Sequence, residues 1–515
     1  MPPWIYESAI AHKAVALAIV VAFSLMTVFF LAGLYVAGAI GSLSLIMMKF
    51  FTDAPLWNIM ANRAWETYTR FLLVAIPLFV LMGELILRSG IADRMYKALD
   101  RWVGPIPGGL LHTNIASCAI FAACSGSSIA TAATISRVAL PAFRARGYNE
   151  RLVVGSLAAG GTLGILIPPS VLLVLYGLST GTSIGRLFLA GFFPGALMAG
   201  TFMLMIAIAA IIWPGIAPRS SSDSYMTLKG WKDRILGTLA VLPVAALIFL
   251  VLGSIYGGWA TPTEAAAAGV SGAFVIAVIS RTYEIWLNLG ALAGRKAGLF
   301  VLLPGALRES AERAAEQAQE YDKVLIKQIA LSNFRMLTEA FMGTIKTTGM
   351  IMFILMAAAT LQFAFAYLHI SEDMARWVVS LDLSSVQLIL IVVVFYLVLG
   401  TFMESYSMML TTLPLIVPTL TASGIDLLWF GIIMIILLEA AQISPPQGLS
   451  LFALHGAQME TQELVGDGTE KPKTINDVYI GVLPFMGCMA IVIGILMVFP
   501  EIALWLPDQV KGARL

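Results

Sequence analysis

The stretch that decides the fold is GTLGILIPPS (Gly161–Ser170), and the chain contains a second version of it, AAQISPPQGL (Ala440–Leu449). Each version has a Pro-Pro pair inside otherwise apolar sequence. Identical residues separated by the same 277 positions surround and include these pairs: Ser128 and Ser405, Pro141 and Pro418, Gly147 and Gly424, Pro168 and Pro445, Pro169 and Pro446. Helix-breaking segments at corresponding positions in two halves of an apolar chain indicate the binding site of a secondary transporter.

The composition is that of an integral membrane protein. Of the 515 residues, 59% are hydrophobic and 12% are charged, and the mean hydropathy is +0.88. Soluble domains have about 45–50% apolar and about 25% charged residues. Uncharged runs of about 20 residues without strand-like alternation favour helices over a barrel. We therefore expect an all-α polytopic protein in a lipid bilayer. The basic residues lie between spans and indicate no nucleic-acid partner.

The apolar runs predict the helices that cross the membrane. Full crossings are expected over 14–48, 71–88, 150–180, 184–212, 235–257, 262–281, 345–368, 428–458 and 475–500. The first is interpreted as a retained span rather than a signal peptide, because the run lacks a clear small-residue cleavage site. Two more apolar segments, 108–142 and 384–418, are interrupted at Ser125–Ser128 and Gly400–Ser405. We interpret both as re-entrant hairpins.

The distribution of Lys and Arg supports the two hairpins. With them, one side of the membrane receives the basic loops, around 88–101, 144–151 and 219–234 and over 281–345. The loops on the other side contain Arg376 as their only Lys or Arg. The positive-inside rule makes the basic side cytoplasmic. The sequence before residue 71 departs from the pattern at three positions: Lys49, Arg63 and Arg70.

This topology makes the two copies inverted repeats. An odd number of crossings separates Gly147 from Gly424, so the second copy is upside down. The first hairpin then enters from the cytoplasm and the second from outside. We divide the chain into N-terminal scaffold helices (1–105), transport repeat one (106–182), scaffold helices (183–281), a charged insertion (282–344), a scaffold helix (345–383), transport repeat two (384–460), and a C-terminal helix and tail (461–515).

The insertion contains two predicted elements. Ala306–Lys323 is rich in charge and is expected to form a solvated cytoplasmic helix. Tyr283–Leu303 is apolar but interrupted by Arg295 and Lys296, so we expect it to lie on the membrane surface. Just before the preceding crossing, Thr261–Glu264 predicts a capping box.

The breaks predict two Na+ sites. A broken membrane helix exposes carbonyl groups at depth, where they can coordinate Na+, and serine and threonine add neutral oxygen ligands. The first site is expected at Ser125, Ser127, Ser128, Gly161, Thr162, Gly164 and Pro168. The second is expected at Gly400, Thr401, Glu404, Ser405, Gln442, Ser444 and Pro445. The substrate is expected to contact Ser127, Ser128, Pro169, Glu404 and Pro446. Helix packing by Gly and Ser and kinking by Pro is the alternative, but the duplication favours ion sites.

Two carboxylates lie in apolar sequence and are functional candidates by default. Glu404 occupies the position that matches Ser127, at a hairpin tip. For Glu439, pairing within the core and titration with protons both remain open. A membrane-embedded enzyme using Glu404 and Glu439 as acid and base is disfavoured, because no second convergent polar cluster accompanies them.

Several stretches resemble the large membrane subunit of TRAP (tripartite ATP-independent periplasmic) transporters. These are IFAACSGSSIATAATI (Ile120–Ile135), GTLGILIPPSVLLVLYG (Gly161–Gly177), GGWATPTEAAAAG (Gly257–Gly269) and the GID-to-SPPQGLSLF segment (Gly424–Phe452). The resemblance implies an Na+-driven elevator-type importer of organic acids in a bacterial or archaeal cytoplasmic membrane. It also implies two partners, a small four-helix membrane subunit and a periplasmic substrate-binding protein.

The chain departs from the family pattern at three places. Ala441 stands where Gly is common, Glu404 stands where Asp is common, and 283–335 is longer than usual. The second ion site is therefore expected to be the more altered one. No small-subunit sequence is fused at the N-terminus, so we expect that partner to be a separate chain. The alternative is a stand-alone sodium/divalent-anion-type symporter.

Overall fold

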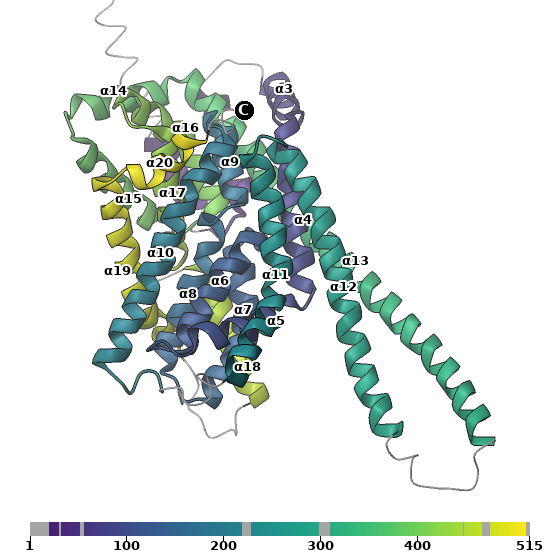
Figure 1. Cartoon of the computed structure of the whole chain (residues 1–515). Helices are drawn as coiled ribbons and strands as arrows, with labels where there is room; N and C mark the ends of the chain where they lie inside the picture. Colours follow the sequence, from purple (N-terminus) through teal and green to yellow (C-terminus); the bar gives the residue numbers. More distant parts are fainter. Residues whose placement is uncertain are drawn as a thin grey trace, which may run out of the picture.

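The computed structural model describes residues 20–29, 32–51, 56–218, 228–297, 309–445, 448–465 and 474–510, which form helices and turns and contain no strand (Figure 1). The helices are Val20–Phe29, α2 (Val36–Phe51), α3 (Leu56–Tyr68), the 3-10 helix η1 (Phe71–Val74), α4 (Ala75–Arg88), α5 (Ile91–Val103), α6 (Leu110–Ser125), α7 (Ser128–Ala145), α8 (Glu150–Leu166), α9 (Val171–Thr180), α10 (Ile184–Ile212), α11 (Leu228–Tyr256), α12 (Pro262–Ala297), α13 (Glu309–Tyr367), α14 (Ile370–Ser380), α15 (Ser385–Leu399), α16 (Ser405–Ala422), α17 (Leu427–Gln442), α18 (Leu449–Val465), α19 (Ile475–Val498) and α20 (Glu501–Gln509). The predicted all-α fold is confirmed.

Most of the predicted crossings correspond to helices. Within the described residues, five segments are long and apolar enough to span a membrane: Phe71–Arg88, Ile184–Ile212, Pro262–Tyr283, Lys327–Tyr367 and Ile475–Val498. The pair α8–α9, bent by 43°, is a sixth candidate. The predicted crossing 235–257 falls within α11.

The predicted first crossing, 14–48, is wrong as a single helix. Its described part consists of Val20–Phe29 and α2, with a turn between them. Gly33 in that turn has a φ of 72°, a left-handed conformation that interrupts a helix. Residues 14–19 and 30–31 lie outside the described residues.

The two Pro-Pro segments break their helices as predicted. A proline has no N–H to donate and its ring clashes with the preceding turn, so a helix ends ahead of it. Accordingly α8 ends at Leu166 and α9 begins at Val171, with Ser170 Oγ accepting a hydrogen bond from the Leu173 N–H at 3.4 Å. In the second copy α17 ends at Gln442 and α18 begins at Leu449. The predicted end at 458 is too early, because α18 continues to Val465.

The two interrupted apolar segments form helix pairs that open at opposite ends of the bundle. The first pair is α6 and α7, which pack against each other, and the short helix α5 packs against both. The second pair is α15 and α16, and the short helix α14, which leads into α15, packs against α16. Figure 1 shows α14 and α16 near one end of the molecule and α5 and α7 toward the other. The short helices that pack on the two pairs, α5 and α14, therefore lie toward opposite ends of the molecule.

The turn that follows each pair is built in the same way. Gly147 and Gly424 both have left-handed φ angles, of 68° and 72°, which glycine adopts without a steric penalty. Two residues later, Asn149 and Asp426 cap the next helices through side-chain oxygens that accept backbone N–H groups. Local chemistry thus explains why the glycines recur with the prolines: the motif ends one helix and starts another.

Polar contacts gather the basic loops at one end of the molecule. Arg146 pairs with Asp100 at 3.3 Å, and Arg151 pairs with Asp477 at 2.8 Å. Arg94 donates to the Ser280 carbonyl at 3.2 Å. These contacts join α5, the α7–α8 turn, α12 and the start of α19. The separation of charge predicted from the sequence is therefore present in the fold.

The insertion differs from its prediction. Residues 283–297 do not form a separate surface segment, because α12 continues through them without a break. Residues 309–323 are helical, as expected, but they begin the 59-residue helix α13, which also contains the predicted crossing 345–368. Figure 1 shows α12 and α13 extending together beyond the body of the molecule. The remaining residues of the two predicted elements, 298–308, lie outside the described part.

The tightest helix crossing joins α8 to α19 through two glycines. A Cβ added to Gly481 would lie 2.1 Å from the Arg151 carbonyl oxygen, and one added to Gly155 would lie 1.9 Å from the Gly481 carbonyl oxygen. Such an approach permits no side chain at either position, as in membrane helix pairs that meet at small residues. The crossing fixes α8, and with it the first break, against α19.

We expect Gly481→Ala to destabilise the protein by about 1–3 kcal/mol, because the new methyl group overpacks a contact between two backbones. The measurement is the melting temperature of the purified chain in detergent. Gly487→Ala on the same helix is the matched control, since its added Cβ meets nothing within 4 Å. Equal melting temperatures for the two variants would contradict the crossing.

Candidate functional site

Glycines of α8 bring the first break against the first hairpin. A Cβ added to Gly160 would lie 2.9 Å from Cys118 Sγ on α6, and one added to Gly161 would lie 2.7 Å from Ala132 Cβ on α7. A Cβ added to Gly164 would lie 3.3 Å from the Ser127 carbonyl oxygen at the tip. The glycine run therefore exists for close helix approach, and it brings Gly161, Gly164 and Ser127 together as predicted.

The tip also meets the residues that follow the break. A Cβ added to Gly126 would lie 3.9 Å from the Pro169 carbonyl oxygen and 3.8 Å from the Val171 nitrogen. We call this region, the Ser125–Ser128 tip with residues 161–170, the first hairpin–break contact. Here the C-terminal ends of α6 and α8 lie near the N-terminal ends of α7 and α9. Helix C-termini favour cations and N-termini favour anions.

The second hairpin–break contact is the Gly400–Ser405 tip with residues 440–445, at the end of α17. A Cβ added to Gly400 would lie 2.3 Å from Ala441 Cβ. Buried Gln442 follows at the end of α17, and its Oε1 has no hydrogen-bond partner within the described part of the chain. The substitution of Ala for a common Gly at 441 is therefore accommodated by a glycine on the facing tip.

The matched residues Ser128 and Ser405 share their place in the hairpins and their burial, and they are two of several buried hydroxyls without a partner among the described residues. Each is the first residue of the second arm of its hairpin, and their exposed fractions are 3% and 0%. Neither hydroxyl has a hydrogen-bond partner among the described residues. A buried hydroxyl without a partner costs about 1–3 kcal/mol, so its occurrence at both tips calls for a ligand or a specific role.

Glu404 has a structural role, as a helix cap, in addition to the role at the ion and substrate site that the sequence predicted. Its carboxylate caps α16, accepting the N–H groups of Tyr406 at 3.1 Å and Ser407 at 2.9 Å and the Ser407 hydroxyl at 2.8 Å. A carboxylate at a helix N-terminus is stabilised by the helix dipole. Glu404 therefore shapes the second tip, at the position where Ser127 lies in the first.

Other predicted ligands have partners in their own segments. The hydroxyls of Thr162, Thr401 and Ser444 donate to the carbonyls of Ala159 at 2.7 Å, Val398 at 2.7 Å and Pro445 at 3.4 Å. Pro168 lies at the first break, and a Cβ added to Gly191 of α10 would meet its Cγ at 3.4 Å. The side chain of Ser125, and all of Pro446, lie outside what the structure describes.

The two repeats interlock. The first half of each broken helix, α8 or α17, packs against both arms of its own hairpin. The second half, α9 or α18, packs against the second arm of the other hairpin, α16 or α7. Tyr176 on α9 adds a hydrogen bond, donating from its hydroxyl to the Leu427 carbonyl at 2.6 Å. The two hairpin–break contacts therefore belong to one packed unit.

Glu439 lies inside this unit. It is on α17, fully buried, and neither carboxylate oxygen has a hydrogen-bond partner in the described segments. Its carboxylate lies beside the backbone of Leu166, where α8 ends. The sequence left two roles open for Glu439, pairing within the core and titration with protons. For the first role, no charged side chain pairs with Glu439 among the described residues.

A cavity that the sequence did not predict opens between this unit and the surrounding helices. Its volume is about 380 Å³, and it lies between α16 and the end of α9 on one side and α3 and α13 on the other. Arg63 and Arg70 line it, and we call it the outer cavity. The sequence did contain a sign of this cavity, because Arg63 and Arg70 are two of the three basic residues that depart from the positive-inside pattern.

The two arginines hold different partners. Arg63 pairs with Glu66 at 2.8 Å, and its Cζ lies 5.0 Å from the centroid of the Phe363 ring. Arg70 makes a long contact of 3.4 Å with the Leu178 carbonyl. No ion pair of Arg70 occurs among the residues that the structure describes. The outer cavity therefore carries a positive charge available to an anion.

Apolar helices long enough to span a membrane, broken helices packed against the tips of two helix pairs and a cavity beside them are features of a multi-pass membrane transporter. The chain belongs to the tripartite ATP-independent periplasmic transporter family, DctM component, whose model matches residues 23–502. The predicted family is thus confirmed, and the chain is a TRAP large membrane subunit. Relatives of this family are permeases rather than enzymes, which removes the enzyme interpretation of Glu404 and Glu439.

Two relatives come from Vibrio cholerae serotype O1. The chain is 29% identical to the C4-dicarboxylate TRAP transporter large permease protein DctM over 500 residues, which cover 97% of this chain and 99% of the relative. It is 28% identical to the sialic acid TRAP transporter large permease protein SiaM, with 93% and 97% covered. Among solved structures, the Alcanivorax borkumensis YdaH transporter is similar with a TM-score of 0.57 at 15% identity, over 95% of this chain and 99% of that one. This last likeness concerns the fold alone.

Proposed function

We propose that this chain, in a bacterial or archaeal cytoplasmic membrane, imports an organic acid as its carboxylate and couples import to Na+. The single observation that carries the proposal is the pair of buried, unpartnered hydroxyls at Ser128 and Ser405, one at each hairpin–break contact. Each serine begins a helix, but the C-terminal end of a broken helix half, α8 or α17, lies at the same contact and presents carbonyl groups. Neutral hydroxyl and carbonyl oxygens suit an alkali cation. The described residues therefore fit Na+ at both contacts.

At the first contact, Ser128 and the carbonyl groups around Ser127 and the end of α8 would hold the ion. At the second, Ser405, Gln442 and the end of α17 would hold it. Na+ bound there would join a hairpin to its broken helix and neutralise part of the charge of an anionic substrate. The N-terminal ends of α7 and α9 favour the substrate carboxylate in the same region, whereas the N-terminal end of α16 is already capped by the Glu404 carboxylate.

The movement that we propose is an elevator movement of the packed unit, α6–α9 with α15–α18 and with α19, which the Gly155–Gly481 crossing fixes to α8, against the other helices. Its support is the interlocking of the two repeats, which makes the unit a single body. The two tips would act as re-entrant hairpins from opposite sides. The outer cavity lies along the boundary that must slide, with Ala358, Ala359 and Ala366 of α13 offering little side chain to obstruct it.

The relatives support a carboxylate substrate, since those named above are described for C4-dicarboxylates and for sialic acid. By analogy, we propose a small four-helix membrane subunit and a periplasmic substrate-binding protein as partners. Proteoliposomes test this: we expect accumulation of an organic acid only with both partners and an inward Na+ gradient. Uptake by the chain alone would support the stand-alone symporter instead. Uptake that is independent of Na+ would overturn the coupling.

We expect Arg70→Gln to raise the half-saturating substrate concentration about tenfold, because it removes a charged hydrogen-bond donor from the outer cavity. The measurement is the concentration dependence of uptake in the complete system. Arg376→Gln, an exposed arginine paired with Asp373 on α14, is the matched control. An unchanged half-saturating concentration for Arg70→Gln would remove this residue from the substrate path.

A further inference from the structure

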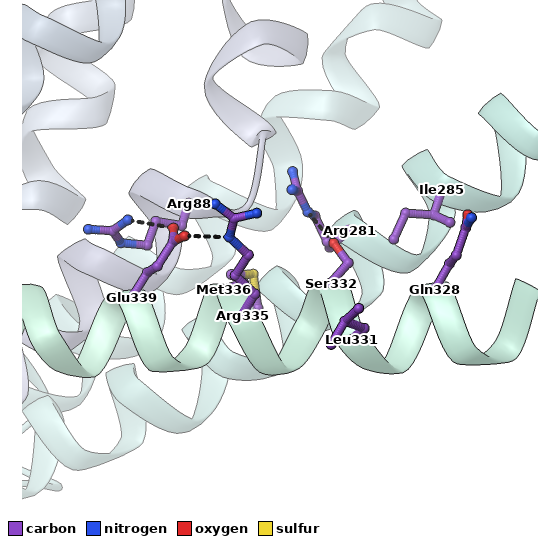
Figure 2. Close-up of a pocket in the computed structure, with 9 residues that line it drawn as sticks. All are labelled: Arg88, Arg281, Ile285, Gln328, Leu331, Ser332, Arg335, Met336 and Glu339. Carbon is purple, nitrogen blue, oxygen red and sulfur yellow. Dashed lines mark hydrogen bonds and ion pairs between the residues drawn. The ribbon is translucent and has the colours of Figure 1, made fainter.

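A second cavity lies between α12 and α13, far from the outer cavity along α13. Its volume is about 580 Å³, and its polar lining consists of Arg88, Arg281, Gln328, Ser332, Arg335 and Glu339. Figure 2 shows Glu339 between Arg88 and Arg335. Arg281, which belongs to α12, lies near Ser332 of α13 in the same view. We call it the arginine cavity. None of its residues belongs to a hairpin–break contact.

The depth of the arginine cavity follows from the ends of two apolar spans. Span Phe71–Arg88 ends at the cavity, and span Pro262–Tyr283 ends just beyond Arg281. The end of an apolar span lies at the level of the lipid headgroups. This end of the bundle also contains the basic loops, so it faces the cytoplasmic leaflet by the positive-inside rule.

The lining carries more positive than negative charge, with three arginines against one glutamate. Arg88 is held by Glu84 at 3.0 Å and Glu339 at 2.9 Å. Arg335 uses its Nε to bind Glu339 at 2.9 Å, and its side chain is 80% exposed. Because a guanidinium has five N–H donors, Arg335 retains donors for another acceptor.

The arginine cavity borders an apolar surface. Leu331, which lines it, and Phe334 on the next turn are 64% and 68% exposed. Phe341 and Ile345 continue this exposed apolar face of α13 toward the middle of its span. A ligand in the cavity therefore meets charge at one end and a lipid-facing helix surface at the other.

We propose that the arginine cavity binds the phosphate of an anionic phospholipid from the cytoplasmic leaflet. Arg335 and Arg281, whose Nε already donates to Ser332 Oγ at 3.1 Å, bind the phosphate oxygens. Gln328 binds the rest of the headgroup, and the acyl chains lie along Phe341 and Ile345, toward the middle of the span. Basic pockets between membrane helices on the cytoplasmic side are suited to such headgroups. Arginine binds phosphate through paired N–H donors. The lipid would join α12, α13 and α4, and this inference does not depend on the proposed transport mechanism.

The test is a lipid titration of the purified full-length chain in detergent, followed by native mass spectrometry. The probes are a phosphatidylglycerol and a phosphatidylcholine with identical acyl chains. We expect the phosphatidylglycerol to bind more tightly. Arg335→Gln should weaken its binding about fivefold, and the double variant Arg281→Gln/Arg335→Gln about 25-fold or more. Arg376→Gln, at the other end of the molecule, should leave it unchanged.

Several outcomes would overturn the proposal. Equal binding of the two lipids would show that negative charge is not recognised, and unchanged binding in both arginine variants would locate the lipid elsewhere. Displacement of phosphatidylglycerol by millimolar inorganic phosphate would mean that the site takes free phosphate. Arg335→Gln alters an exposed side chain, so it decides the question even if the double variant does not fold.

Discussion

Gly161→Ala is expected to reduce Na+-driven uptake by about ten- to a hundredfold. The added Cβ would lie 2.7 Å from Ala132 Cβ and 3.1 Å from Ala132 Cα, so the α7 backbone itself must move away from α8. Overpacking of this kind costs about 1–3 kcal/mol, and each 1.4 kcal/mol corresponds to about a tenfold change in an equilibrium constant. The displaced elements form the first hairpin–break contact.

The measurement is initial uptake in the complete reconstituted system, at several Na+ concentrations. Gly200→Ala is the control, because its added Cβ on α10 meets nothing within 4 Å. We expect part of the lost uptake to return at high Na+ if the variant weakens ion binding. Normal uptake by Gly161→Ala would mean that this contact has no part in transport.

Ser128→Ala and Ser405→Ala are expected to have opposite effects without and with Na+. Without Na+, each removes a buried hydroxyl that has no partner among the described residues, so stability should be unchanged or slightly higher. With Na+, each should lose the stabilisation that ion binding gives the native state. Losing one charge-assisted contact should weaken Na+ binding by about ten- to a hundredfold.

Melting temperatures at a series of Na+ concentrations measure both effects in one experiment, with K+ or choline replacing Na+. Ser423→Ala, at the C-cap of the helix that begins at Ser405, is the control, since the Ser423 hydroxyl already donates to the Thr419 carbonyl at 3.0 Å. A mere packing role predicts equal destabilisation with and without Na+. That result would favour the packing interpretation of these serines.

The duplicated motif allowed the sequence to predict most of the candidate site. Pro168, Gly147 and Asn149 act through the backbone within a few residues, by ending, turning or capping helices, and such effects can be inferred locally. The same holds for Thr261 and Glu264, whose predicted capping box is confirmed by contacts of 2.8 Å and 3.4 Å. Matching positions in both halves then predicted which tip meets which break.

Features that depend on distant partners could not be predicted in this way. Nothing near Gly155 indicates that it meets Gly481, and nothing near Arg88 indicates that it meets Glu339 on α13, 251 residues further along the chain. The path of α12 beyond Tyr283 was wrongly predicted because Arg295 and Lys296 interrupt an apolar run without breaking the helix. Charge changes where a helix lies in the membrane, whereas only backbone chemistry or packing ends it.

The most direct test of the central claim is the number of Na+ ions bound per chain, measured with radioactive Na+ on the purified protein. The two hairpin–break contacts predict two ions for the wild type, one for Ser128→Ala and one for Ser405→Ala. The double variant should bind none at the concentrations that saturate the wild type. Equal stoichiometry in the wild type and the double variant would contradict the account.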